Sequence, residues 1–142
     1  MMLVDANALI YAVNSDSSWY DDSKAWLDSA LVGSEPLGFS WLVILAFWRL
    51  STHPSVFAEP LDVGTAGSII EAWLSQPAAR VIQPTPRHLS VLSGLLTSSG
   101  SGANLVNDAH LAALAVEHNA TVMTFDSDFA RFAGVRHRRP GS

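Results

Sequence analysis

The chain contains no cysteine and only one lysine, Lys24, among its 142 residues. The lack of cysteine excludes a disulfide framework and a cysteine-based zinc site. The longest strongly apolar run, Trp41–Leu50, is too short to cross a bilayer, which takes about 20 apolar residues. No Gly-x-Gly-x-x-Gly follows the first apolar run and no Gly-x-Ser-x-Gly is present, which argues against dinucleotide binding and against a serine-hydrolase elbow.

The composition is that of a folded, rather apolar domain. Hydrophobic residues make up 49% of the chain and charged residues 15%, which excludes the disordered class and predicts some apolar surface buried against a partner. The length suits one domain, residues 1–142. Met1–Tyr11 carries Asp5 within its first apolar stretch and has no basic leader, so we expect no signal peptide, a cytoplasmic location and no membrane partner.

The net charge of −5 argues against a generic nucleic-acid coat protein. The positive charges are unevenly spread, however, because four of the eight Lys and Arg residues fall near the C-terminus: Arg131, Arg136, Arg138 and Arg139. Two interpretations remain open, a solvated basic tail and an edge that contacts phosphates.

Apolar runs and turn residues predict strands that alternate with helices. Strands are expected at Met2–Val4, Pro36–Phe39, Arg80–Ile82 and Ala120–Phe125, with a candidate edge strand at Val135–His137. Helices are expected at Ala6–Val13, Trp19–Leu31, Trp41–Leu50, from Asp62 or Thr65 to Leu74, Arg87–Thr97 and Leu105–His118, with a flexible loop at Ser98–Gly102. The alternation predicts an α/β domain with a mainly parallel central sheet flanked by helices.

Four aspartates stand at the ends of these predicted elements. Asp5 follows the first strand, Asp126 follows the strand Ala120–Phe125 with Asp128 close behind, and Asp108 lies in the opening turn of the last long helix. Parallel α/β sheets bind ligands at the carboxyl ends of their strands, where these acids are expected to meet. Such a group of like charges is costly unless a divalent cation neutralises it, and oxygen ligands suit Mg²⁺ or Mn²⁺.

Each acid also has a purely structural interpretation. Asp5 can cap the following helix, Asp108 can complement a helix dipole, and Asp126-Ser127-Asp128 resembles an ordinary turn. Together these interpretations require several acids to gather at one sheet edge by coincidence. A phosphatase built on Asp5 is disfavoured, because Lys24 lies in a tryptophan-rich helical segment and does not follow a later strand.

Three segments resemble one known family. They are Leu3–Tyr11 (LVDANALIY), Asn104–Ala113 (NLVNDAHLAA) and Val122–Phe129 (VMTFDSDF), and in order and spacing they are similar to PIN-domain ribonucleases of the VapC toxin type. The resemblance implies a parallel sheet with acids gathered around Mg²⁺ or Mn²⁺ at its carboxyl edge. It implies Asp5, Asp108 and Asp126 as metal ligands and adds Asp128 to the catalytic set as a neighbour that binds through water.

The resemblance also implies biological partners. These are an RNA substrate, a cognate antitoxin whose tail occupies the groove beside the active site, and a second copy in a homodimer. The alternative function is a catalytically weak PIN-like module that binds RNA or protein. RNA cleavage in Mg²⁺ or Mn²⁺ that stops in EDTA distinguishes the enzyme from the module.

One departure from the family pattern concerns a glutamate usually found in the helix after the second strand. The aligned position is Phe47, which either replaces that carboxylate near the metal or packs in the core with the alignment shifted by a turn. Glu71 substitutes only if its helix approaches the site. Asn7 and Thr124 are expected either to orient the acids or only to cap and pack. Four tryptophans in predicted helices are expected in the core unless they form an interface: Trp26, Trp41, Trp48 and Trp73. We expect none of the five histidines to bind metal.

Overall fold

The computed structural model describes residues 1–100 and 102–142. Within them, five short strands form one sheet in the order β3-β2-β1-β4-β5, and all neighbouring strands are parallel. The strands are β1 (Met2–Val4), β2 (Leu37–Phe39), β3 (Ala79–Val81), β4 (Thr121–Met123) and β5 (His137–Arg138). The expected α/β architecture with a parallel sheet is therefore confirmed.

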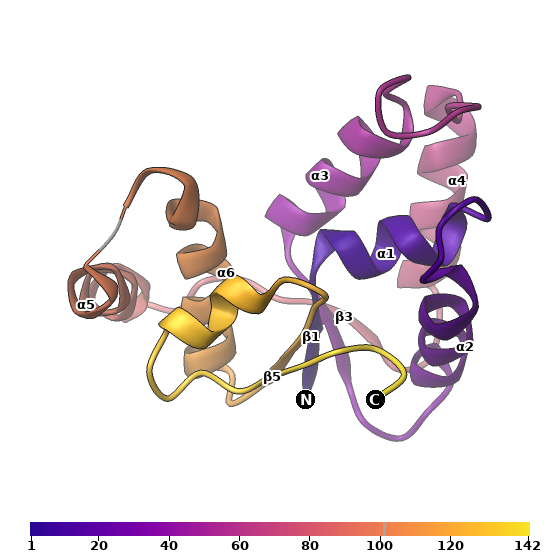
Figure 1. Ribbon diagram of the computed structural model, residues 1–142. Helices are drawn as coiled ribbons and strands as arrows, with labels where there is room; N and C mark the ends of the chain where they lie inside the picture. The colour runs from indigo at the N-terminus through magenta and orange to yellow at the C-terminus, as the bar shows by residue number, and fades with distance from the viewer. Residues whose placement is uncertain (101) are drawn as a thin grey trace.

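Helices connect the strands and cover both faces of the sheet. The α-helices are α1 (Ala6–Val13), α2 (Tyr20–Leu31), α3 (Trp41–Ser51), α4 (Val63–Leu74), α5 (His88–Ser99) and α6 (Val106–Glu117), with 3-10 turns η1 (Ala103–Leu105) and η2 (Ser127–Arg131). Helices α1 to α4 gather on one side of the sheet and α5 and α6 on the other (Figure 1). None of the described helices combines the length and the apolar character needed to span a membrane.

Strand β1 lies at the centre of the sheet, and its neighbours bring distant parts of the chain together. Leu3 pairs with Gly38 on one side and with Val122 on the other. A Cβ at Gly38 would come within 3.3 Å of a Leu3 methyl carbon, so the position takes only the smallest residue without a shift of its neighbours. Val4 pairs with Met123, and the residues that follow β1 and β4 therefore emerge side by side.

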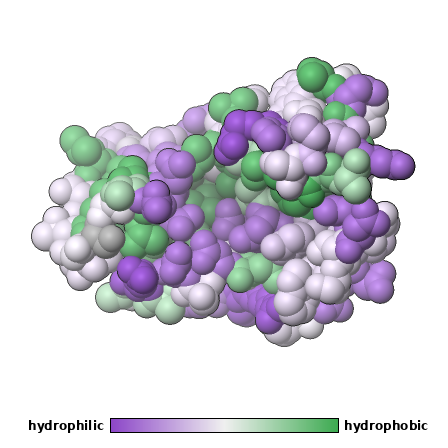
Figure 2. Space-filling model, turned by 45° about the horizontal axis from the view of Figure 1, so that its top comes forward, coloured by the Kyte–Doolittle hydropathy of each residue, from purple (hydrophilic) through white to green (hydrophobic). Residues whose placement is uncertain are grey.

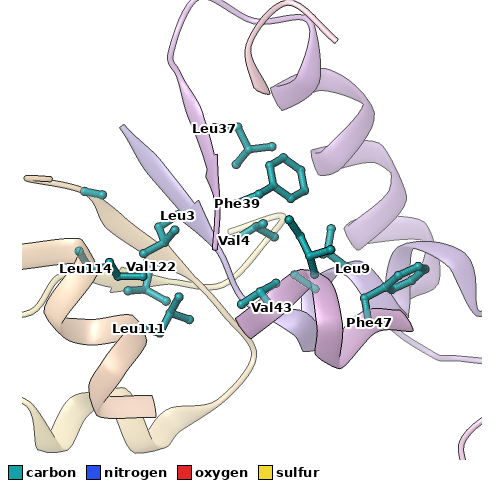
Figure 3. Packing of buried hydrophobic residues seen from close by; sticks show 14 of the residues in the cluster. Leu3, Val4, Leu9, Leu37, Phe39, Val43, Phe47, Leu111, Leu114 and Val122 are labelled. Carbon is teal, nitrogen blue, oxygen red and sulfur yellow. The ribbon is translucent and has the colours of Figure 1, made fainter. Parts of the chain in front are cut away.

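The hydrophobic core fills the space between the sheet and its helices (Figure 3). Leu3, Val4 and Phe39 of the sheet are at most 1% exposed. On the other side, α6 contributes a nearly continuous apolar surface whose buried members are Ala109, Leu111, Ala112, Ala113, Leu114 and Ala115. This packing fixes the start of α6, and Asp108 within it, against the sheet.

Helix α5 has no fully buried residue. Its Leu92, Leu95 and Leu96 are partly buried against the core, and polar contacts add to this attachment. The fully buried Glu117 side chain of α6 accepts hydrogen bonds from the Thr85 amide, at 2.9 Å, and from the Thr85 hydroxyl. Its other oxygen pairs with His88 Nδ1, and His88 Nε2 lies 2.8 Å from His110 Nδ1. These four residues, which we call the Glu117 network, join α5 to α6.

The structure shifts several predicted boundaries. Strand β4 is shorter than Ala120–Phe125, since its pairing with β1 covers Thr121–Met123. Strand β5 begins two positions later than the predicted edge strand, since its pairing with β4 starts at His137. The predicted flexible loop Ser98–Gly102 was wrong at its start, since Ser98 and Ser99 continue α5 up to Gly100, whose φ of +67° ends the helix. Ser101, also in that loop, lies outside the described residues.

Candidate active site

The site is built where β1 and β4 end next to each other. Asp5 caps α1, because its Oδ1 accepts a hydrogen bond from the Ala6 amide at 2.7 Å. Its Oδ2 accepts the hydroxyl hydrogen of Thr124 at 2.7 Å and a weaker bond from the Asn7 side-chain amide at 3.3 Å. Asp5 therefore has the capping role that its position predicts and is also oriented by residues from the neighbouring strand.

Asn7 and Thr124 complete the connection between the two strand ends. The Asn7 side chain accepts a hydrogen bond from the Phe125 amide at 3.1 Å and donates one to Thr124 Oγ1 at 3.2 Å. The buried Thr124 hydroxyl also accepts from the Asp126 amide at 2.9 Å. The orienting role expected for these two residues is thus seen in their contacts, which position Asp5 and Asp126 relative to each other.

Asp108, Asp126 and Asp128 converge at the same edge, with one carboxylate oxygen of each lying within 4.8 Å of the others. We call these three residues the acid group. Asp126 caps η2 by accepting the Asp128 amide at 2.8 Å, and Asp108 lies in the first turn of α6. Asp5 stands next to the acid group and is not a member of it by this criterion.

Negative charge accumulates at this edge without full compensation. Burial, the neighbouring carboxylates of Asp126, Asp5 and Asp128, and a hydrogen bond shared with Asp126 raise the pKa of Asp108 from 3.8 to about 6. Burial also raises the pKa of Asp5, although its hydrogen bonds from Thr124 and Ala6 act in the opposite direction. Among the described residues, the one ion pair to the acid group is Arg131 with Asp128, at 3.6 Å.

These properties fit a hard divalent cation. The donors are carboxylate oxygens, the metal-capable group contains no histidine among the described residues, and a cation would relieve the repulsion that raises the pKa of Asp108. The sequence prediction that the acids meet is borne out for Asp108, Asp126 and Asp128, with Asp5 adjoining them.

A cavity of about 470 Å³ opens beside the acids between α1, α3 and α6. Its lining combines the polar Asp5, Asn107, Asp108 and Arg49 with Ala6, Leu42, Val43, Leu45, Ala46 and Leu111. Figure 2 looks onto the face at the carboxyl ends of the strands, where hydrophilic residues lie in a hollow between hydrophobic ones. A polar floor with apolar walls suits a ligand that is anchored by charge and partly desolvated.

Of the two interpretations of Phe47, the structure supports packing in the core and contradicts a place beside the acids. Phe47 is fully buried and its ring lies 4.8 Å from that of Trp73 in α4. Figure 3 shows it on the side of α3 away from Leu111 of α6. The next residue toward the start of the helix, Ala46, lines the cavity with Asp5 and Asp108, because one step along a helix turns the side chain by about 100°.

Glu71 does not replace the missing acid, since it is exposed on α4 and lies outside the acid group of the described residues. Of the helical tryptophans, Trp26, Trp48 and Trp73 pack against the core, and Trp41 is 49% exposed. Sequence reasoning missed Arg49 and Ala46 as cavity residues. The signal available was helical spacing: Ala46 lies four positions after Leu42, and Arg49 lies four positions after Leu45, which puts these residues on one face of the helix.

Comparison with known proteins agrees with this geometry. The PIN domain family model matches residues 2–135. The chain is 51% identical to ribonuclease VapC37 of Mycobacterium tuberculosis over 99% of its length and 97% of the relative's. It is 39% identical to ribonuclease VapC31 of the same species, with 99% of each chain covered.

Solved structures share the fold at low sequence identity. VapC20 of Mycobacterium tuberculosis, described as a sarcin-ricin loop cleaving toxin, superposes with a TM-score of 0.67 at 18% identity, covering 96% of this chain and 99% of that one. The structure of VapBC-1 from Haemophilus influenzae superposes with a TM-score of 0.69 at 17% identity, covering 99% of this chain and 98% of that one.

The fold and the acidic sheet edge thus define a PIN-domain protein, and the chain belongs to the PIN-domain family. Within that family, it belongs to the VapC ribonucleases. The resemblance found in the sequence is confirmed.

Proposed function

We propose that the protein is a divalent-metal-dependent endoribonuclease and the toxin of a toxin–antitoxin pair. The observation that supports this most directly is the convergence of Asp108, Asp126 and Asp128 within 4.8 Å at the carboxyl edge of the sheet. The full-length similarity to proteins named ribonuclease VapC supports RNA as the substrate.

Asp108, Asp126 and Asp5 are proposed as ligands of Mg²⁺ or Mn²⁺, with Asp128 acting through water. When bound, the cation would lower the pKa of a nearby water and stabilise the charge that develops on the scissile phosphate. Asp5 is included because its negative charge raises the pKa of Asp108, and the charge of Asp126 in turn raises the pKa of Asp5. Thr124 and Asn7 hold the Asp5 carboxylate in one orientation, which keeps the site preorganised.

The reaction is hydrolysis of one phosphodiester bond. A water oxygen forms a bond to phosphorus, one ester P–O bond breaks, and the leaving oxygen takes up a proton. A carboxylate oxygen of the acid group is proposed to accept the proton from the attacking water. Arg49, on the wall of the cavity that contains Asp5 and Asp108, is proposed to bind a phosphate of the same strand.

A cognate antitoxin is proposed as the protein partner. Structural neighbours include a VapBC2 complex from Rickettsia felis bound to promoter DNA and VapBC-1 from Haemophilus influenzae. In this chain Trp41 is 49% exposed and Leu45, on the cavity wall, is 57% exposed, so an apolar surface adjoins the acids. A protein segment that covers this surface would exclude RNA from the cavity.

The test is RNA cleavage by the purified protein. Cleavage of a mixed single-stranded RNA is expected in Mn²⁺ or Mg²⁺ and is expected to stop when EDTA exceeds the metal. RNA that is retained on the protein but stays intact in Mn²⁺ would instead indicate the binding-module alternative.

A further inference from the structure

Three aromatic rings gather directly beside the acid group. Phe125, which precedes Asp126, lies 5.1 Å from the Tyr11 ring in an edge-on arrangement and 5.3 Å from the Trp19 ring. The guanidinium carbon of Arg139 lies 3.6 Å above the Trp19 ring and 5.2 Å from the Phe125 ring. Three separate segments of the chain therefore meet beneath one arginine from a fourth. We call Trp19, Phe125 and Arg139 the stacking platform.

Arg139 is held in place by the end of the chain. The Thr124 amide bonds to the Arg138 carbonyl at 2.8 Å, which continues the pairing of β4 and β5. Pro140 is buried, and Gly141 has a φ of +87°. A Cβ added at Gly141 would lie 3.1 Å from the Cβ of Asp22. The Ser142 amide closes the turn by bonding to the Arg139 carbonyl at 3.1 Å. The C-terminal arginines near the acids are therefore not a loose solvated tail.

The charge of Arg139 is available to a ligand. The residue is exposed, and no carboxylate forms an ion pair with it among the described residues. A cavity of about 380 Å³ is lined by Phe125, Asp126, Arg138 and Arg139, together with Thr124, Ser127, His137 and Ser142. Because Asp126 belongs to both this cavity and the acid group, a ligand bound here reaches the proposed site of cleavage.

We propose that the stacking platform binds a base of single-stranded RNA next to the scissile phosphate. One face of the Arg139 guanidinium covers the indole of Trp19, which leaves its other face for a nucleobase and its N–H edge for a phosphate. Arg138, on the same cavity, provides a second positive charge for the backbone. This inference rests on the proposed ribonuclease function and adds the residues that bind the substrate strand.

The chemistry favours RNA over a protein ligand at this position. A planar cation backed by two rings offers a flat surface that every unpaired base matches, and an adjoining phosphate balances the charges of Arg138 and Arg139. Arg136 differs, because its guanidinium donates to the Asn119 carbonyl at 3.2 Å and to the Asn119 side chain at 3.0 Å. It lies at the opposite end of β4, beside Thr121, and serves as a matched control.

The experiment measures binding of a fluorescein-labelled single-stranded oligoribonucleotide by anisotropy, in EDTA so that the RNA stays intact. Arg139→Gln is expected to weaken binding about tenfold, and Arg136→Gln is expected to leave it unchanged. Arg139→Lys separates stacking from charge: the platform predicts a loss close to that of Arg139→Gln with the salt dependence of wild type retained. Trp19→Leu, which removes the ring beneath Arg139, is expected to weaken binding in the same way.

Wild-type affinity in Arg139→Gln, or full recovery in Arg139→Lys, would overturn the platform. If this surface bound a protein such as an antitoxin instead of RNA, Arg139→Gln would keep the wild-type affinity for RNA. The proposed function is tested separately by wild-type cleavage in Mn²⁺: RNA binding that depends on Arg139 without cleavage would contradict the ribonuclease and leave the platform intact. Normal cleavage by wild type and by Arg139→Gln at limiting RNA would contradict the platform alone.

Discussion

The hydroxyl of Thr124 donates a hydrogen bond to Asp5 Oδ2 at 2.7 Å and joins residues that are 119 positions apart in the chain. This bond links the ends of β4 and β1. It also lowers the pKa of the half-buried Asp5, against the effect of burial, which raises it. The Thr124 side chain is itself buried, so its partners have no water to replace it.

Thr124→Val, which keeps the shape and removes the hydroxyl, tests this relationship. We expect a loss of about 1–3 kcal/mol in the free energy of unfolding, because a buried hydrogen bond and the acceptor of the Asp126 amide disappear together. The pKa of Asp5 should rise further, and cleavage should slow. Urea unfolding measures the first effect, an NMR titration the second and a cleavage assay the third. Thr121→Val, at the other end of the same strand, is the control and should leave the free energy of unfolding, the pKa of Asp5 and the cleavage rate unchanged.

The raised pKa of Asp108 predicts how stability depends on pH in the metal-free protein. The folded chain binds this proton up to about pH 6, whereas in the unfolded chain the carboxyl titrates near 3.8. The free energy of unfolding therefore falls as the pH rises from about 4 to about 6, because the folded protein must then hold the charged carboxylate, and it falls no further from this cause above that range. The difference in unfolding free energy between Asp108→Asn and wild type, measured in EDTA, should grow in favour of the variant across this window. A pH-independent difference would contradict the crowding of charge at the site.

Metal binding should show the opposite dependence, since a cation competes with the proton on Asp108. Mn²⁺ affinity measured by calorimetry should fall as the pH drops below about 6, with proton release on binding. Equal affinity at pH 5 and pH 7.5 would count against Asp108 as a ligand.

Two neighbouring substitutions on α3 distinguish its faces. Ala46→Glu adds a carboxylate to the cavity that contains Asp5 and Asp108, so it should tighten Mn²⁺ binding several-fold with little loss of stability. Phe47→Glu buries an unpaired acid against Trp73 and should destabilise the fold by several kcal/mol. Calorimetric titration and thermal unfolding of both variants provide the comparison. Tighter metal binding by a stable Phe47→Glu protein would contradict the orientation of this helix.

The Glu117 network gives a prediction about α5. Glu117→Ala removes the buried acceptor of the Thr85 amide and the carboxylate partner of His88 Nδ1, which should lower the free energy of unfolding by about 1–3 kcal/mol. Because α5 has no buried residue of its own, amide hydrogen exchange should accelerate in α5 more than in α1. Glu71→Ala, on the exposed face of α4, is the control. Uniform acceleration throughout the chain would mean that α5 does not open separately.

Much of the fold could be predicted from the sequence, because periodicity and capping residues are local signals. Ser40 and Asp62 cap α3 and α4 by accepting hydrogen bonds from the amides three positions later. The predicted helices begin at Trp41 and at Asp62 or Thr65, close to these caps. The acids were also predictable, since Asp5 directly follows β1 and Asp126 lies three positions after the end of β4, and these two strand ends meet at one edge.

The parts that could not be predicted depend on packing between distant segments. Whether position 46 or 47 faces the acids depends on the rotation of α3 against α4, where Phe47 meets Trp73. The stack of Arg139 on Trp19 joins segments that no periodicity links, and basic composition at the C-terminus was equally compatible with a solvated tail. The pairing of Glu117 with Thr85 and His88 likewise exists only once α5 packs on α6.

The central claim is that the acid group cleaves RNA with a divalent cation, and Asp108→Asn tests it most directly. The substitution keeps the shape of the side chain and removes one ligand charge. In Mn²⁺, we predict that wild type and Asp21→Asn, an exposed control on α2, cleave single-stranded RNA at equal rates, and that Asp108→Asn is slower by at least about a hundredfold while remaining folded. Cleavage by Asp108→Asn at the wild-type rate and at equal metal concentration would contradict the account.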